Sequence, residues 1–346
     1  MSTEVKSSNS LQGRILSALA FYDIFEYPLT LLEIHRFLQC YDRGREKNAQ
    51  FSLGDILRQL NFLKNKIGQE SGFYFLKNKG ISMRTSEYSE FNVVKSEEIV
   101  QKRIARHNAA QKRWKKAVRL TKFLASVPFL KMVAVCNMFP IDTPKSDSDI
   151  DLFIVAKHGR IWFTRFAVTA IIMLTGQWRH KKIANKLCLS FFVSDENLDL
   201  RKLYKEKNLA IDNDVYLYNW IELIAPVYDK DGTYEKFREA NFWNRENLPN
   251  MFGYFGVKQR RVDGGIAART WRRFFEFILR GNFGKKIEDF ARYVQFAYMK
   301  TDQKNRIANP NVVASNEVLK FHEVDRRKEF KKIFFDNVKL QEMNGE

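Results

Sequence analysis

The segment 145–155 constrains the fold of this chain more than any other, because a polar turn runs directly into an apolar strand. From Ile150 onward it has the β-branched, aromatic and aliphatic composition of a buried strand. Asp149 and Asp151 lie at its first positions with one residue between them. Alternate side chains of a strand point to the same face, about 7 Å apart. The sequence therefore predicts two carboxylates on one face at the mouth of a buried strand.

Two carboxylates in this position repel each other unless a cation lies between them. Metal pairs in phosphoryl-transfer enzymes lie about 3.5–4 Å apart and hold a triphosphate. We therefore predict that Asp149 and Asp151 are catalytic and bind Mg²⁺ or Mn²⁺. The alternative interpretation is a polar strand entry whose acids are solvated.

The flanking residues favour metal binding. An apolar run, 129–136, ends at Asn137, and a loop leads from there to the strand that carries the acids. Two strands joined in this way, with the word S-D-I-D-L before further hydrophobic residues, resemble the polymerase-beta-like nucleotidyltransferase superfamily. The resemblance implies an α/β (α+β) nucleotidyltransferase fold, an NTP substrate and Mg²⁺ as cofactor. It assigns metal binding to Asp149 and Asp151, and places Ser148 where the family commonly has a serine that braces the turn.

The turn after the first strand departs from the family pattern. The family has Gly-Ser there, opening a helix whose backbone N–H groups hold phosphate. This chain has Asn137 and Met138 instead. Asparagine can adopt the left-handed conformation of the glycine, whereas methionine has no hydroxyl for a phosphate. Lys157 and Arg160 offer positive charge after the acid-bearing strand, although basic residues are also common in ordinary loops. The candidate nucleotide-binding residues are Asn137, Met138, Ser148, Lys157 and Arg160.

A third carboxylate, which active family members usually carry on a later strand, is missing from the matching strand 186–193. That acid often acts as the base on the acceptor, so its loss affects catalysis more than metal binding. Two functions fit this sequence. One is a Mg²⁺-dependent nucleotidyltransferase that moves an NMP from an NTP to an acceptor hydroxyl. The other is a catalytically weak or inactive nucleotidyltransferase fold that binds a nucleotide or nucleic acid in a regulatory role.

Helical spacing and turn signals divide the rest of the chain. Helices over 11–25, 31–38 and 53–66, followed by a hairpin of strands 72–76 and 81–84, predict a winged helix-turn-helix domain. The words F-Y-D-I-F-E-Y-P-L-T and G-F-Y-F-L resemble the N-terminal region of a group of bacterial nucleotidyltransferase-domain proteins. The predicted organisation is a disordered tail at 1–10, a winged helix-turn-helix domain at 11–95, a basic helical linker at 96–127, the nucleotidyltransferase domain at 128–204 and a C-terminal helical domain at 205–346.

The net charge of +19 favours an anionic partner. Basic residues recur along the predicted linker helix: Lys102, Arg103, Arg106, Lys112, Arg113, Lys115, Lys116, Arg119 and Lys122. With the basic residues of the third helix and the wing, they make nucleic acid a candidate partner through the linker and the winged helix. The alternatives are a solvated helix face and a winged helix that binds only protein.

The cysteines and the apolar segments bear on the compartment. Cys40, Cys136 and Cys188 are far apart and form no C-x-x-C pair, so a reducing cytoplasm is the simplest setting. The first residues are polar and lack the apolar core of a signal peptide. The apolar segment 161–178 is interrupted by charge and too short to cross a bilayer. We therefore expect a cytoplasmic protein with no membrane partner.

Overall fold

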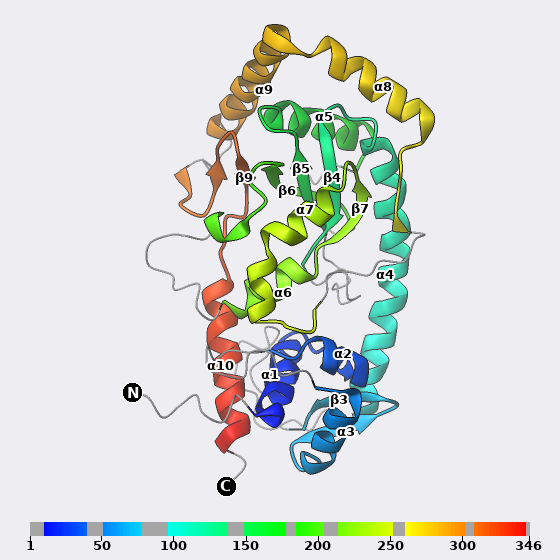
Figure 1. The fold of residues 1–346 in the computed structure, drawn as a ribbon, viewed down its shortest axis with the longest axis vertical. Coiled ribbons are helices and arrows are strands. Elements are labelled where there is room, and N and C mark those ends of the chain that lie inside the picture. The colour runs from blue at the N-terminus through cyan, green and yellow to red at the C-terminus, as the bar shows by residue number, and fades with distance from the viewer. Residues whose placement is uncertain are drawn as a thin grey trace.

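A six-stranded mixed sheet organises the centre of the computed structural model, which describes residues 10–39, 51–77, 96–137, 149–177, 185–203, 214–251, 260–301 and 308–343 (Figure 1). The strand order is β7-β4-β5-β6-β9-β8. The strands are β4 (Leu130–Val135), β5 (Ile150–Ala156), β6 (Leu187–Ser194), β7 (Ala225–Asp229), β8 (Val313–Ala314) and β9 (Val318–Lys320). With the helices around it, this sheet gives the mixed α/β class that the sequence predicts.

The central strands carry the topology that positions the site. β4 and β5 are antiparallel, whereas β5 and β6 are parallel and joined through the helix α5 (Ile161–Leu174). A parallel pair needs such a crossover, and the apolar segment after β5 supplies it. The predicted strands 129–136, 150–156 and 186–193 and the helix 160–178 are thereby confirmed, with small shifts at their ends.

Different helices cover the two faces of the sheet. Ile150, Leu152 and Ile154 of β5 point into a core shared with α4 (Ser96–Leu124), α5 and α9 (Gly281–Thr301). Phe153 and Val155 point the other way, against α6 (Val215–Glu222) and α7 (Thr233–Ala240). Asp151 alternates with the first set, so its side chain lies on the face covered by α6.

The N-terminal region forms a second, smaller unit (blue in Figure 1). Its helices are α1 (Leu11–Asp23), α2 (Leu31–Arg36) and α3 (Leu53–Phe62), and its three-stranded sheet has the order β1 (Leu29–Thr30), β3 (Phe73–Leu76), β2 (Ile67–Glu70). Capping boxes open α2 at Thr30 and α3 at Ser52.

The predicted hairpin was wrong in its partner. β3 pairs with β2, which precedes it, across the two-residue turn Ser71-Gly72. Both turn residues have positive φ, 51° and 80°, which is what the favoured two-residue hairpin turn requires. The segment 81–84, which the sequence pairs with this strand, lies outside the described residues.

Helical spacing over 215–227 predicts a single helix, but the structure has the helix α6 followed by the strand β7. Pro226 disfavours a helical conformation for Ala225, and the residues after it are good strand formers. Short 3₁₀ turns, η2 (Leu200–Leu203) and η3 (Phe242–Glu246), follow β6 and α7.

The C-terminal region, predicted as one helical domain over 205–346, is divided among three places. β7, β8 and β9 join the central sheet. The last helix, α10 (Arg327–Met343), packs on α1 and α6, where Ile333 and Phe334 enter the core of the N-terminal unit. The helices α8 (Gly265–Ile278) and α9 form an arch over one end of the sheet (Figure 1). Among the described helices, none has both the length and the apolar character needed to cross a bilayer.

Candidate functional site

The two carboxylates come together as their spacing predicts. Asp149 directly precedes β5, and Asp151 is its second residue. Their carboxylate oxygens and the Cys188 sulfur all lie within 4.8 Å of one another. Cys188 comes from β6, where it pairs in register with Asp151. The site is therefore a three-residue cluster on two parallel strands.

The sequence does not predict that Cys188 lies beside the two acids. Its place in the strand where the family carries a third acid was a usable signal, but its register against Asp151 follows only from the parallel pairing. Mg²⁺ and Mn²⁺ prefer oxygen ligands, whereas a thiolate suits softer ions such as Zn²⁺. The two carboxylates fit Mg²⁺, which is usually bound by one or two carboxylates together with substrate phosphates. In the described part of the chain, the third member of this cluster is thus a thiol and not a carboxylate.

Asn137, at the end of β4, holds one of the two acids in place. Its φ of 60° is left-handed, as predicted for a residue in the position of the family's glycine. Its side-chain amide donates to Asp151 Oδ2, while its Oδ1 accepts from Trp220 Nε1 at 2.7 Å and from the Tyr216 hydroxyl at 3.2 Å. Because an indole nitrogen can only donate, this network fixes which end of the amide faces the carboxylate.

Cys136 closes the site from the side of β4. Its thiol is 3.6 Å from the backbone carbonyl of Asp151, to which it donates. Burial raises the pKa of Cys136 well above its ordinary value, and the neighbouring Asp151 carboxylate adds to this effect. Burial and the neighbouring negative charge therefore both favour the neutral form of this thiol.

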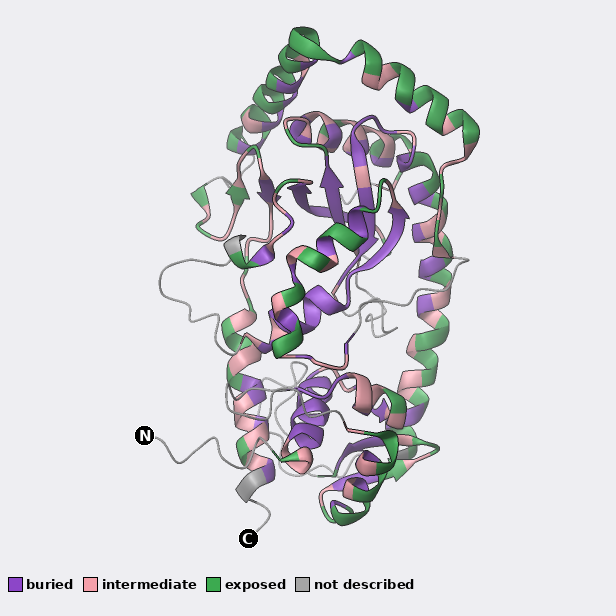
Figure 2. Cartoon of the chain, viewed as in Figure 1, coloured by how far each residue is buried: buried purple, intermediate pink, exposed green. Residues whose placement is uncertain are grey.

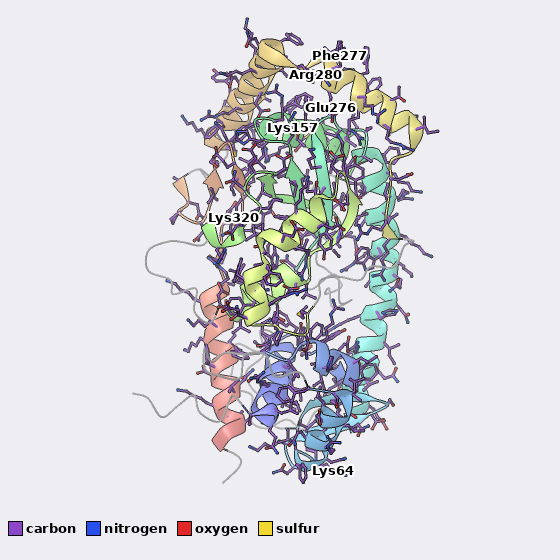
Figure 3. The ribbon with its side chains drawn as sticks, in the orientation of Figure 1. Lys64, Lys157, Glu276, Phe277, Arg280 and Lys320 are labelled. Carbon is purple, nitrogen blue, oxygen red and sulfur yellow. The ribbon has the colours of Figure 1, made fainter. Side chains whose placement is uncertain are left out.

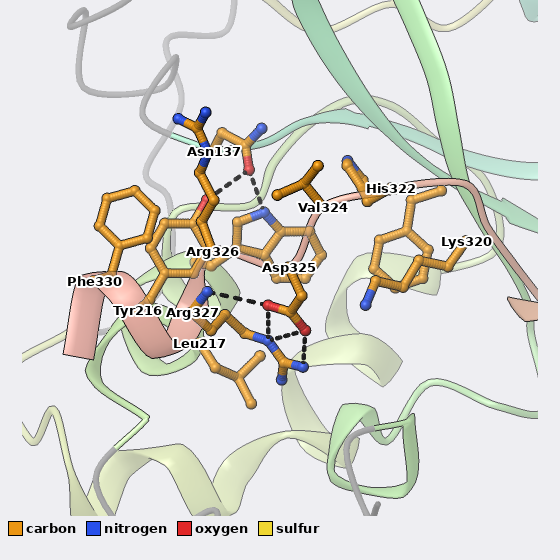
Figure 4. Close-up of a pocket in the computed structure, with 12 residues that line it drawn as sticks. Asn137, Tyr216, Leu217, Lys320, His322, Val324, Asp325, Arg326, Arg327 and Phe330 are labelled. Atoms are coloured by element: carbon orange, nitrogen blue, oxygen red, sulfur yellow. Dashed lines mark hydrogen bonds and ion pairs between the residues drawn. The ribbon is translucent and has the colours of Figure 1, made fainter. Parts of the chain in front are cut away.

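A cavity of about 290 Å³ opens beside Asn137 (Figure 4). It lies between the sheet, α6 and the start of α10. Its aromatic walls come from Phe191, Tyr216, Trp220 and Phe330, and its polar lining includes Lys320, His322, Asp325, Arg326 and Arg327. Aromatic walls with nearby cations suit a ligand that has a planar ring and negative charge.

The aromatic walls are two stacked pairs. Phe191 stacks on Trp220 at a centroid distance of 5.5 Å, and Tyr216 stacks on Phe330 at 4.6 Å. Trp220 and Tyr216 are the same side chains that hydrogen-bond Asn137. The cavity wall and the acid pair are thus joined through one amide.

Arg327 fixes the rim of the cavity. It binds Asp325 through two nitrogens and reaches Asp214 on α6 at 3.3 Å. Burial alone would raise the pKa of Asp325, but hydrogen bonds and charge from Arg327 lower it to about 2. This guanidinium is committed to the rim, and Lys320 and Arg326 are the other cations of the cavity lining (Figure 4).

Lys157 and Arg160 do not join this site. They follow the C-terminal end of β5, about 20 Å from the acids by strand length. Figure 3 shows Lys157 close to the arch. The Arg160 guanidinium lies over the Phe129 ring and donates to the carbonyl of Leu279. The predicted phosphate contact is thus corrected to a structural role for Arg160.

Two predicted site residues remain to be located, together with the acids that directly follow β6. Met138 and Ser148 lie outside the described residues. Asp195 and Glu196 follow β6 at the end remote from the acid pair, where both contact His158. Neither therefore supplies the missing third carboxylate.

Comparison with protein-family models, with curated proteins and with solved structures finds no match to this chain. The function of this protein is therefore inferred from its sequence and from the geometry of the site.

Proposed function

We propose that this protein is a divalent-metal-dependent nucleotidyltransferase that moves an NMP from an NTP to an acceptor hydroxyl. The observation that carries the proposal is the convergence of Asp149 and Asp151 at the mouth of β5, beside a left-handed Asn137 at the end of the antiparallel strand β4. This is the arrangement that the resemblance to the polymerase-beta-like superfamily leads one to expect. On the same view, the N-terminal unit is a winged helix.

The residues have separate tasks. Asp149 and Asp151 would hold Mg²⁺ or Mn²⁺, which supplies positive charge to the triphosphate. Asn137 orients Asp151 and turns the backbone at the place where phosphate would be held. The cavity supplies aromatic surface for the base, where stacking contributes on the order of 1–3 kcal/mol, and cations from Lys320 and Arg326.

The second candidate function is an inactive or weakly active nucleotide-binding regulator. It is favoured by Cys188, which stands where a third carboxylate would act on the acceptor hydroxyl. A thiol held near two carboxylates is a poor general base, since their negative charge opposes its ionisation. A regulator that binds a nucleotide shares with the enzyme an NTP and a metal at the acid pair and differs from it only in transfer, whereas a regulator that binds nucleic acid needs neither.

Calorimetry with Mn²⁺ and a non-hydrolysable NTP tests what the two functions share. We expect binding in the wild type and none in the double variant Asp149→Asn, Asp151→Asn. The control is Asp289→Asn, an exposed acid on α9. If the double variant bound Mn²⁺ and the NTP as tightly as the wild type, the acid pair would not be the binding site. Incorporation of labelled NTP into RNA, protein and the chain itself then separates the enzyme from the inactive binder.

A further inference from the structure

The two helices of the arch turn their apolar sides outward. On α8 the exposed large apolar residues are Ile266, Trp271, Phe274, Phe277 and Ile278. On α9 they are Phe283, Phe290, Tyr293, Val294 and Tyr298. Several are more than half exposed, with Phe277 at 68% and Tyr293 at 72%. Helices on the surface of a protein normally bury this side and expose their polar one. We call this outer surface the apolar face of the arch (Figure 2).

Polar side chains attach the arch to the sheet. The Arg272 guanidinium donates to the carbonyl of Ala125 and to the Tyr228 hydroxyl. The Glu276 carboxylate accepts from the backbone N–H of Phe129 at 2.9 Å.

On α9, Glu288 accepts from the first N–H groups of α5 at 2.9 Å, and Gln295 donates to the carbonyl of Trp162 at 2.9 Å. Turning the apolar face inward would break these buried bonds. The outward orientation is therefore specified by the polar contacts.

Positive charge borders the apolar face. At about 100° per residue, the exposed apolar side chains of α8 cover an arc of roughly 140°. Arg269 and Arg273 lie along one edge of this arc and are exposed, and Arg280, two residues after the end of α8, is exposed as well. On the side toward the sheet, the same arginines border a hollow that also has acidic lining residues. Figure 3 shows Phe277 on the outer side of the arch and Glu276 on the side of the sheet.

We propose that the apolar face of α8, with the first turns of α9, binds the surface of an anionic lipid bilayer. A helix with Trp and Phe on one side and arginine beside them lies in the interface, its apolar side about 5–10 Å deep. Each arginine near an anionic membrane strengthens binding about fivefold, and the net charge of +19 acts in the same direction.

The charge and the side-chain types favour a bilayer over other occupants. In an antiparallel pair of copies packed face to face, the two rows of arginine would lie side by side, which is repulsive. Single-stranded RNA could stack on the aromatic rings, but Ile266 and Ile278 lack the flat aromatic surface on which bases stack. A helix lying in the interface does not span the membrane, so this proposal is compatible with the finding on spanning helices, although it departs from the sequence expectation of no membrane partner.

Co-sedimentation of the full chain with vesicles tests the proposal. We expect binding to vesicles of phosphatidylcholine and phosphatidylglycerol in equal parts, and much weaker binding to phosphatidylcholine alone. The double variant Trp271→Ser, Phe277→Ser should weaken binding roughly tenfold or more. The matched control is Phe62→Ser, Phe123→Ser, which removes two rings that are exposed elsewhere, at 73% and 55%.

A second measurement locates the contact directly. Trp271 emission, taken as the difference between the wild type and Trp271→Phe, should shift to shorter wavelength when anionic vesicles are added. No sedimentation with anionic vesicles, or equal sedimentation of the Ser variant, would overturn the proposal. A dimer without lipid that the Ser variant dissociates would assign the face to a second copy instead, and binding to single-stranded RNA alone would assign it to nucleic acid.

Discussion

At the scale of single residues, Asn137 combines two tasks that the family's glycine does not have to combine. Its backbone takes the left-handed turn, and its amide joins the Asp151 carboxylate to Trp220. Glycine in this position would keep the turn without strain but would remove the amide. The side chain of Asn137 is thus a positioning group, and the two tasks can be separated by mutation.

Asn137→Gly should weaken binding of Mn²⁺ with a non-hydrolysable NTP by roughly tenfold. The physical reason is that Asp151 loses its donor and Trp220 Nε1 loses its acceptor, each at a cost of about 1–3 kcal/mol. Calorimetry measures the affinity, and thermal unfolding measures the accompanying loss of stability. Ala267→Gly, at an exposed position, is the control for adding a glycine. Unchanged affinity in Asn137→Gly would show that the amide does not position the acid.

Cys188→Asp should lower the stability of the metal-free protein and raise its affinity for Mn²⁺. A third carboxylate beside two others repels them, and a bound cation removes that repulsion. Cys188→Ser, similar in size and uncharged, is the control, and should weaken binding of Zn²⁺ while sparing that of Mn²⁺. Thermal unfolding with and without each metal decides this. An Asp variant that Mn²⁺ fails to stabilise beyond the wild type would show that Cys188 does not face the cation.

At the scale of elements, the structure divides the basic residues of α4 into a set with identified partners and an exposed set. Arg103 pairs with Glu33 and Arg106 pairs with Glu26, both at 2.8 Å, so these two fasten the N-terminal unit. Lys102 pairs with Glu98, and Arg113 and Lys116 donate to Asn185. The exposed set repeats at helical spacing along one side: Lys112, Lys115, Arg119 and Lys122. Only this second set remains as the phosphate track that the sequence predicts.

Replacing the exposed set by Gln should reduce salt-sensitive binding to nucleic acid. Each phosphate contact adds about 0.7–0.9 to the slope of log affinity against log salt, so the slope should fall by roughly 3. Anisotropy titrations over a range of salt concentrations measure it. The control changes the same net charge at exposed positions of other helices, Lys236 on α7 and Lys328, Lys332 and Lys339 on α10. An equal slope for the two variants would remove α4 from the candidate interface.

Local signals explain which elements the sequence predicts well. The helix over Ser96–Leu124 and the capping boxes at Thr30 and Ser52 depend on residues within a few positions of one another. Asp149 and Asp151 were predictable for the same reason, since two positions on one strand share a face. The position of Cys188 beside the acids and the existence of the cavity were not predictable, because both depend on contacts between segments far apart in the chain. The sequence does not predict β2, because the apolar run from Gly72 has the composition of a strand start, whereas Gly72 is part of the turn.

At the scale of the whole molecule, the two ends of the chain share one core. Phe334 of α10 is 1% exposed and packs edge-on against Phe21 of α1 at a centroid distance of 6.4 Å. Phe330, one turn earlier, lines the cavity and lies 5.4 Å from the Phe25 ring. The last helix therefore connects the candidate site to the N-terminal unit, and neither end forms an independent domain.

Phe334→Ala should destabilise the N-terminal unit more than the central sheet. Removing a buried phenylalanine costs about 3–5 kcal/mol, and here the cavity left behind lies among residues of α1. Hydrogen exchange should accelerate in α1 and α10 and change little in β5 and α5, whose core does not include this ring. Phe242→Ala, at a ring that is 60% exposed, is the matched control and should leave exchange unchanged. If instead only α10 exchanged faster, α1 would hold its structure without α10, and the shared core would not couple the two ends of the chain.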